Sequence, residues 1–269
     1  MKKNTLLPTA LSVLAAGGLA HAQVSGTIAS IEGNVTSGTT GVTISPSPII
    51  TAIGSSPQTL DGYTYGNYAI VAQDATGSLV VFGKATTYFG SYTPAVGDAL
   101  NVTGTYSPFD GIPELASPSA VGAASHGNTL PTVPTYTIAQ VSTSTTTLPQ
   151  NVEGYLVNID NVTILTNGVA PIGLNFPTHA NGTYTITDGV NSLTLYQWAS
   201  SYSLAGALGG AAIPTGPVDI EGLVDVFTSG TTSTSEFIPF GITSVPEPSP
   251  MALATLGGGA LLAVLRRRK

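Results

Sequence analysis

Cysteine is absent from this sequence of 269 residues. Disulfide bonds, which commonly reinforce domains outside the cytoplasm, therefore contribute nothing to its stability. Burial of apolar surface has to stabilise the fold instead. The length suffices for one large β domain or two small ones.

Positive charge is nearly absent from the body of the chain. Six of the seven Lys and Arg residues lie at the two ends, as Lys2, Lys3 and the run from Arg266 to Lys269. Between residues 23 and 245 only Lys84 remains, against thirteen Asp and Glu, which gives a formal charge near −12. Because proteins bind phosphate groups through Lys and Arg, we expect neither nucleic acid nor an anionic membrane surface as a partner.

Helix-forming residues are scarce as well. Thr, Ser, Gly and Val dominate the body of the chain, with few Lys, Glu or Leu. This composition favours strands and is typical of exported proteins. We therefore predict an all-β fold.

The first 22 residues have the three parts of a secretory signal peptide. A basic start is followed by an apolar stretch and by small residues at a cleavage site: Lys2-Lys3, Leu6 to Ala20, and Ala20-His21-Ala22. We predict an N-terminal signal helix over residues 1–22 that engages the Sec translocon and is then removed. The mature chain is expected to begin at Gln23.

The end of the chain, residues 246–269, also has three parts: Pro246-Glu247-Pro248, an apolar stretch over residues 251–265, and Arg266-Arg267-Arg268-Lys269. Prolines end helices, so a hydrophobic membrane helix is predicted over residues 251–265 only. At ~1.5 Å per residue this helix reaches ~22 Å, less than the ~30 Å hydrocarbon core of a bilayer. The basic stop is expected to stay cytoplasmic, which leaves everything before the helix outside.

This tail resembles the PEP-CTERM sorting domain of exported bacterial proteins, over less than a tenth of the chain. The resemblance implies recognition by an exosortase in the membrane and processing near the Pro-Glu-Pro motif. It also implies a chain that is membrane-anchored before processing and that ends at the cell envelope surface or in the extracellular matrix. A membrane anchor that persists is the alternative.

The body of the chain repeats itself, with three matches in the same order. The matched segments are Val24–Ile31 with Val152–Ile159, Asp74–Phe82 with Asp188–Tyr196, and Leu100–Gly104 with Val218–Gly222. We predict a first β module over residues 23–122, a linker over 123–150 and a second β module over 151–245. Residues 36–66 and 167–182 are expected to be long loops.

Two of these matches predict secondary structure. Leu100 and Val102 alternate with polar neighbours, which is the period of a half-buried strand. In the other match, two strands flank a tight turn that begins at Asp74 or Asp188. Turn formation is therefore the role expected for these two aspartates.

A second resemblance rests on Gly97-Asp98-Ala99-Leu100-Asn101-Val102-Thr103-Gly104, Tyr106, Phe109-Asp110-Gly111 and Pro113-Glu114-Leu115. This stretch resembles the later strands of OB-fold modules in secreted bacterial proteins, which often sit beside extracellular nucleases. The resemblance implies two tandem OB-like Greek-key barrels. The second module departs from the pattern at Pro217 and at Phe227–Gly230. Ig-like β-sandwiches are the alternative.

No catalytic or metal-binding set of residues is apparent. His126 and His179 are the only histidines of the mature body, and no strand or helix frames either one as a catalytic triad requires. Asp219, Glu221 and Asp225 share strand parity, but a solvated strand face is preferred to a calcium site because no calcium-binding loop is present. We predict no enzyme activity, no cofactor and no metal. A carboxylate pair for glycoside cleavage stays open, because its spacing is spatial rather than sequential.

Aromatic residues cluster around the predicted hairpins. Tyr88 and Tyr92 in the first module and Trp198 in the second are candidates for stacking on sugar rings, although core packing is the preferred interpretation. The main functional prediction is a non-enzymatic surface or matrix protein associated with extracellular polysaccharide or biofilm. The alternative is an OB-fold ligand-binding module related to secreted nucleases or other hydrolases.

Overall fold

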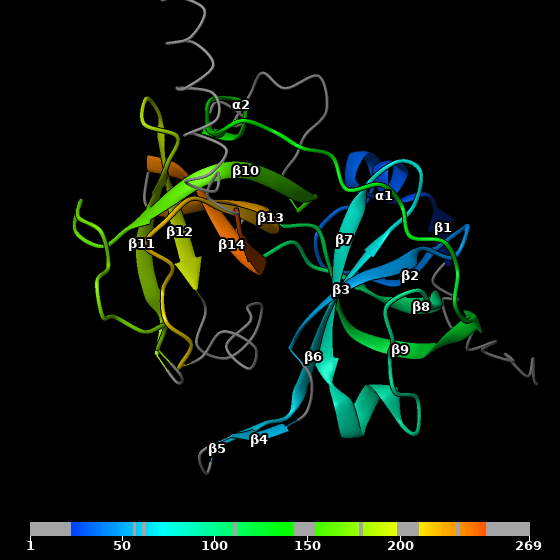
Figure 1. Cartoon of the computed structure of the whole chain (residues 1–269). Coiled ribbons are helices and arrows are strands. Elements are labelled where there is room, and N and C mark those ends of the chain that lie inside the picture. Colours follow the sequence, from blue (N-terminus) through cyan, green and yellow to red (C-terminus); the bar gives the residue numbers. More distant parts are fainter. Residues whose placement is uncertain are drawn as a thin grey trace, which may run out of the picture.

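The computed structural model describes residues 23–55, 58–60, 63–109, 112–142, 154–177, 180–197, 210–229 and 232–245. Within these residues the fold is all-β. Two barrel-like sheets lie beside each other, and each surrounds an apolar core (Figure 1).

The first barrel is built from the N-terminal strands. They are β1 (Val24–Gly26), β2 (Thr39–Ile44), β3 (Ile49–Ser55), β6 (Asn67–Gln73), β7 (Ser78–Lys84), β8 (Ala99–Tyr106) and β9 (Glu114–Ser125). The sheet order is β1-β2-β8-β3-β6-β7-β9, and a further pairing of β8 with β9 closes five of these strands into a ring. The other elements of this half are helix α1 (Ile28–Asn34), the small hairpin of β4 (Gln58–Leu60) and β5 (Tyr63–Tyr65), and the π-helical turn η1 (Ala85–Phe89).

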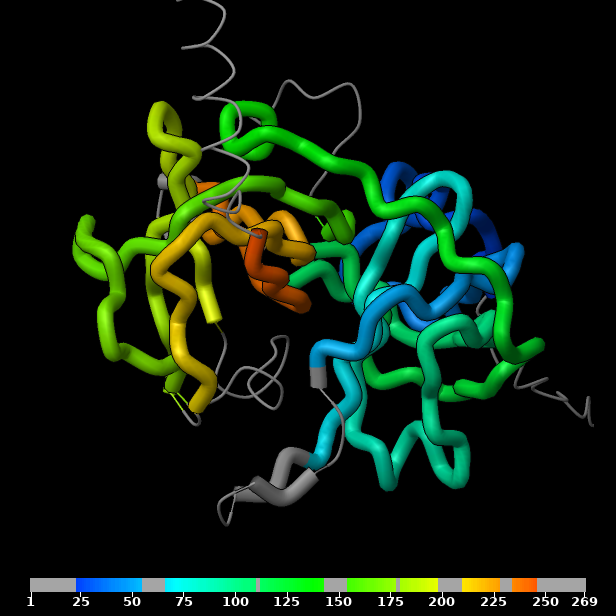
Figure 2. The backbone as a smooth tube through the Cα atoms, viewed as in Figure 1, coloured from blue at the N-terminus to red at the C-terminus, as the bar shows by residue number. Residues whose placement is uncertain are grey.

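The second barrel follows helix α2 (Ile138–Ser142). Its strands are β10 (Leu156–Leu165), β11 (Gly182–Thr187), β12 (Ser192–Gln197), β13 (Val218–Ser229) and β14 (Thr232–Ser244), closed in the order β10-β11-β12-β14-β13. Both rings contain one parallel contact, between β7 and β9 in the first and between β12 and β14 in the second. The segment from residue 126 to 142 passes from one barrel to the other along one side (Figure 2).

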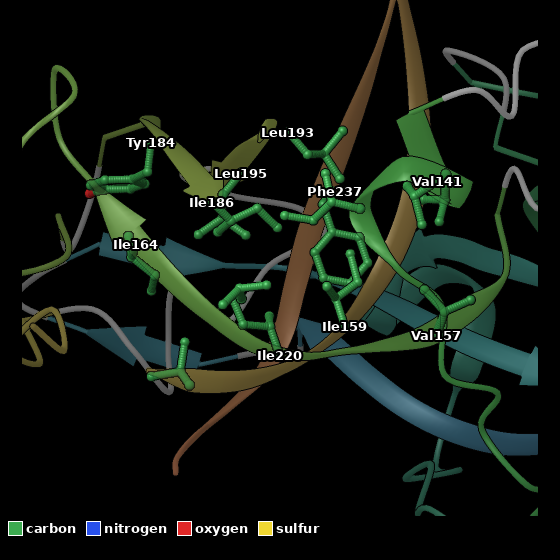
Figure 3. Packing of buried hydrophobic residues seen from close by; sticks show 14 of the residues in the cluster. Val141, Val157, Ile159, Ile164, Tyr184, Ile186, Leu193, Leu195, Ile220 and Phe237 are labelled. Atoms are coloured by element: carbon green, nitrogen blue, oxygen red, sulfur yellow. The ribbon is translucent and has the colours of Figure 1, made fainter. Parts of the chain in front are cut away.

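Strand alternation builds the core of each barrel. In β11, Tyr184 and Ile186 point inward, while the residues between them point outward. Figure 3 shows these two side chains with Leu195 of β12 and Phe237 of β14 inside the second barrel. The predicted alternation in β8 is confirmed, since Leu100 and Val102 are buried while Asn101 between them is exposed.

An apolar contact joins the two barrels. It brings outward side chains of β3, β6 and β7 against the start of β10 and against β13 and β14: Ala52, Ala69, Val71 and Val80 on one side, and Leu156, Leu223, Ile238 and Phe240 on the other. Polar contacts flank it, because Ser78 Oγ donates to Gly154 O and Tyr155 Oη donates to Thr76 O at 2.7 Å. Burial, with nearby Glu32 and Asp74, raises the pKa of Tyr155 to about 12.

One sequence-based expectation about the first module is wrong, and one of the three sequence matches does not extend to the structure. The segment Val24–Ile31, which matches the start of β10 in sequence, forms short β1 and then enters α1, because the Thr27 hydroxyl caps the helix by accepting from Ser30 N. Residues 36–66 are not one long loop, since they contain β2 and β3. Strand β9 runs to Ser125, three residues into the predicted linker.

Candidate ligand-binding surface

The outward side chains of β11 and β12 form a polar surface on the second barrel, here called the front face. It comprises six residues that alternate with core residues along the hairpin: Thr183, Thr185, Thr187, Ser192, Thr194 and Tyr196. Cross-strand pairing places Thr183 opposite Tyr196 and Thr185 opposite Thr194. Five hydroxyls and a phenol therefore lie on one side of a two-stranded ribbon.

The protein itself uses few of these hydroxyls. Among the described residues, Thr183, Thr185 and Thr194 make no side-chain hydrogen bond. Asn181 Nδ2 donates to Tyr196 Oη at 2.7 Å and so fixes the ring at one end of the surface. A hydroxyl can both donate and accept, so the front face can meet hydrogen-bonding groups of either kind.

The equivalent surface of the first barrel is apolar and covered. The two hairpins match at an offset of 114 residues, which aligns their turn residues Asp74 and Asp188. At this offset, Ala69, Val71, Val80 and Phe82 stand where the second barrel has Thr183, Thr185, Thr194 and Tyr196. The four apolar side chains pack into the contact with the second barrel. The first barrel therefore has no free front face, whereas Thr183 of the second is exposed.

The two aspartates predicted to form turns do so. Asp74 Oδ1 accepts from Thr76 N at 2.6 Å, and Asp188 Oδ1 accepts from Asn191 N at 2.6 Å. Backbone donors at Asn191 and Val190 lower the pKa of Asp188. The first turn has a further contact, because Asp74 Oδ2 accepts from the backbone of α1.

The predicted stacking residues do not lie on the front face. Tyr88 and Tyr92 pack against the core of the first barrel. Tyr92 Oη donates to Asp98 Oδ2 at 2.8 Å, and burial together with this contact raises the pKa of Tyr92. The side chain of Trp198 lies outside the described residues.

His126 has a framework that the sequence did not suggest. It directly follows β9, and its Nδ1 lies 2.6 Å from Oδ1 of Asp98, which directly precedes β8. The Asp98 carboxylate is buried and the His126 ring is exposed. In the described part of the chain, no hydrogen bond links the other ring nitrogen to a serine or threonine, as a triad requires. His179 lies outside the described residues.

The three acidic residues of β13 are not the solvated row that was expected. Asp225 is only 1% exposed and pairs across the sheet with Glu236. Asp219 Oδ1 accepts from Asn161 N at 2.8 Å, and burial raises the pKa of Glu221. The described residues contain no group of three or more His, Cys, Asp or Glu side chains that could hold a metal ion.

The sorting and cleavage residues lie almost entirely outside the described residues: Ala20, Ala22, Pro246, Glu247, Pro248, Arg266, Arg267, Arg268 and Lys269. Gln23, the predicted mature start, is exposed and donates from Nε2 to Thr43 Oγ1 at 2.7 Å. Among the described helices, none has the length and apolar character needed to cross a membrane.

No family model and no curated protein matches this chain. Several solved structures are similar to this chain. A murine DNA-binding protein bound to double-stranded DNA is 12% identical, with 75% of this chain and 96% of that chain covered and a TM-score of 0.36. The p202 HIN1 domain in complex with 12-mer double-stranded DNA is 10% identical, with 70% of this chain and 85% of that chain covered and a TM-score of 0.35. A Replication Protein A heterotrimer bound to single-stranded DNA is 9% identical, with 75% of this chain and 48% of that chain covered and a TM-score of 0.35.

These similarities contradict two predictions, the polysaccharide-associated matrix protein and the exclusion of nucleic acid as a partner. The physical reason is that a charge count over the whole chain excludes only binding through ion pairs, whereas bases also bind by stacking on aromatic rings. The DNA in those structures belongs to those proteins.

Proposed function

We propose that this chain is an exported ligand-binding protein of two tandem OB-like barrels, and that the front face of the second barrel binds the ligand. One observation carries the proposal. Where the first barrel has four apolar residues covered by its neighbour, the second has three threonines and a tyrosine.

The strand order supports the OB-like assignment. An OB fold is a five-stranded Greek-key barrel that binds oligonucleotides and oligosaccharides on the face of its second and third strands. In the second barrel β11 and β12 occupy these two places, and the ring closes by a parallel contact of β12 with β14. An Ig-like sandwich consists of two antiparallel sheets, so this closure favours the OB-like alternative.

The ligand class follows from the chemistry of the front face. Tyr196 offers a ring for stacking, and the threonine hydroxyls offer hydrogen bonds to base edges. No Lys or Arg occurs between residues 85 and 265, so ion pairs cannot supply the affinity. A single-stranded oligonucleotide held by stacking and hydrogen bonds is the ligand that we infer.

Export and sorting belong to the same proposal. The signal-like residues 1–22 and the PEP-CTERM-like tail at 246–269 support delivery to the cell envelope surface through the Sec translocon and an exosortase. The protein would bind there without catalysing a reaction.

Titration of labelled single-stranded oligothymidylate with residues 23–245 tests the proposal. This part of the chain holds every described helix and strand and lacks the basic tail. Fluorescence anisotropy should show binding that Tyr196→Ala weakens by roughly 5–150-fold, which corresponds to the ~1–3 kcal/mol of one lost stack. Thr185→Val, tested as a separate variant, should also weaken binding. Thr105→Val should not, because Thr105 is a half-buried strand threonine of the first barrel.

Salt provides an independent criterion. Counterion release makes ordinary nucleic-acid binding weaker as salt rises. An acidic protein whose single Lys, Lys84, lies in the other barrel should show the reverse or no change, because salt screens its repulsion of the phosphates. Absence of binding, or binding that salt abolishes and Tyr196→Ala leaves unchanged, contradicts the proposal.

A further inference from the structure

One end of the second barrel carries both the loop after β10 and the exit of the chain toward its C-terminus. Ile213 N donates to Leu174 O at 3.0 Å, which ties that loop to the segment before β13. Four residues further on, Pro217 O accepts from Val245 N at 3.0 Å. The surface formed by residues 166–177 and 210–217 is called the loop end below.

The loop end is apolar, exposed and uncharged. Val169 is 65% exposed, Ile172 81% and Leu174 46%. Ala211 and Ala212 are exposed beside them. Neither segment contains Asp, Glu, Lys or Arg. A surface of this kind can enter an apolar environment without dehydrating a charged group.

The tail limits how far this end can lie from a membrane. Only residues 246–250, three of which are proline, separate Val245 from the apolar stretch at 251–265. Five residues span at most ~18 Å when fully extended. If the apolar stretch is inserted in a bilayer, the side of the barrel that carries Val245 must therefore face the bilayer and lie close to it.

We propose that the loop end docks on the lipid surface while the tail is membrane-inserted, with Val169, Ile172 and Leu174 in the interfacial layer. This inference rests on the export part of the proposed function, in which the PEP-CTERM-like tail anchors the chain in the membrane before processing. A bilayer is the occupant favoured here, because the tether brings it to this end of the barrel. Uncharged apolar side chains of this kind partition into the headgroup–acyl boundary. The lipid should be zwitterionic, since the acidic body repels anionic headgroups.

The absence of cysteine allows a direct test on the full chain. Ile172→Cys and, in a separate variant, Val190→Cys would each carry one polarity-sensitive fluorophore. Val190 is the matched control, because it is 89% exposed and apolar but lies in the turn after β11, whereas residues 166–177 of the loop end precede that strand. Both chains would be reconstituted into phosphatidylcholine vesicles, and flotation would report anchoring separately.

With the chain anchored, the label at position 172 should shift to the blue and lose its quenching by aqueous iodide, while the label at 190 should stay as it is in solution. A floating chain in which both labels remain in water overturns the docking and leaves anchoring intact. Equal shifts at both positions overturn it as well, because contact would not be specific to the loop end. A chain that does not float overturns the anchored stage and the docking together.

Discussion

At the scale of single residues, Asp98 is the clearest case of a buried charge held by its neighbours. Its carboxylate accepts from Tyr92 Oη at 2.8 Å and from Ala95 N at 3.2 Å, and it lies 2.6 Å from His126 Nδ1. Burial alone raises the pKa of Asp98, but the hydrogen bonds from His126, Tyr92 and Ala95 outweigh it and lower the pKa. The carboxylate thus connects the segment after η1, the start of β8 and the end of β9.

The substitution Asp98→Asn should therefore destabilise the protein in a pH-dependent way. Since the folded pKa is lowered, the charged form stabilises the fold above the unfolded pKa of ~3.9, and this contribution disappears as the pH falls through the folded pKa. We expect a loss of about 2–3 kcal/mol in the free energy of unfolding at pH 7, as for hydrogen bonds to a charged group. Urea denaturation at several pH values measures it.

The difference between Asp98→Asn and the native chain should narrow below about pH 4. Asp160→Asn serves as the control, because Asp160 is an exposed carboxylate and surface substitutions usually change stability by less than ~0.5 kcal/mol. A difference for Asp98→Asn that stays constant from pH 7 to pH 3 would contradict the role assigned to the charge.

At the scale of elements, one outward row of side chains decides what each hairpin does. In the first barrel the row on β6 and β7 is apolar and packs on β13 and β14 of the second barrel. In the second barrel the corresponding row on β11 and β12 is hydroxylic and remains accessible. The same strand–turn–strand unit therefore serves as an interface in one place and as a candidate binding surface in the other.

Shortening a side chain that the second barrel contributes to this interface should weaken the contact between the barrels. Leu223 of β13 is fully buried within it, so Leu223→Ala should lower the free energy of unfolding by about 2–5 kcal/mol. Because the lost packing joins the two barrels, they should unfold less cooperatively, and the thermal transition should broaden or split into two. Thr185→Ala on the front face should change stability by less than ~0.5 kcal/mol. A single sharp transition with unchanged midpoint for Leu223→Ala would show that the contact is not stabilising.

The hairpins could be predicted from the sequence because their information is local. Alternation along β8 and the aspartate turns each involve residues a few positions apart. The ring closures could not, since the contact of Val80 with Glu114 joins strands separated by a loop, a helical turn and another strand. The match of Val24–Ile31 to β10 failed because local capping at Thr27 favours α1 over a longer strand.

The sequence contains a signal for the front face, but this signal cannot be interpreted without the structure. The repeat offset of 114 residues shows Val71 replaced by Thr185 and Val80 by Thr194, always at outward positions. Without the three-dimensional contact between the barrels, threonine on a strand is only a residue with high β propensity. The contact between the barrels explains the difference, because it buries Val71 and Val80 of the first barrel.

At the scale of the whole molecule, the two barrels are arranged head to tail. The front of the first packs on the back of the second, formed by β13 and β14, and this leaves the front of the second without a partner barrel. Head-to-tail contacts of similar units can continue into open chains of molecules. Hydroxyls in place of the apolar row give the second barrel a front face that does not repeat this contact, and so leave it available for a ligand.

The most direct measurement of this account is the map of amide chemical shifts of residues 23–245 on titration with single-stranded oligothymidylate. We expect shift changes at the outward residues of β11 and β12, which are Thr183, Thr185, Thr194 and Tyr196. The shifts of β6 and β7 should stay unchanged, because the second barrel covers these strands. Changes concentrated on β6 and β7 or on the back of either barrel, or no changes at any concentration, would contradict it.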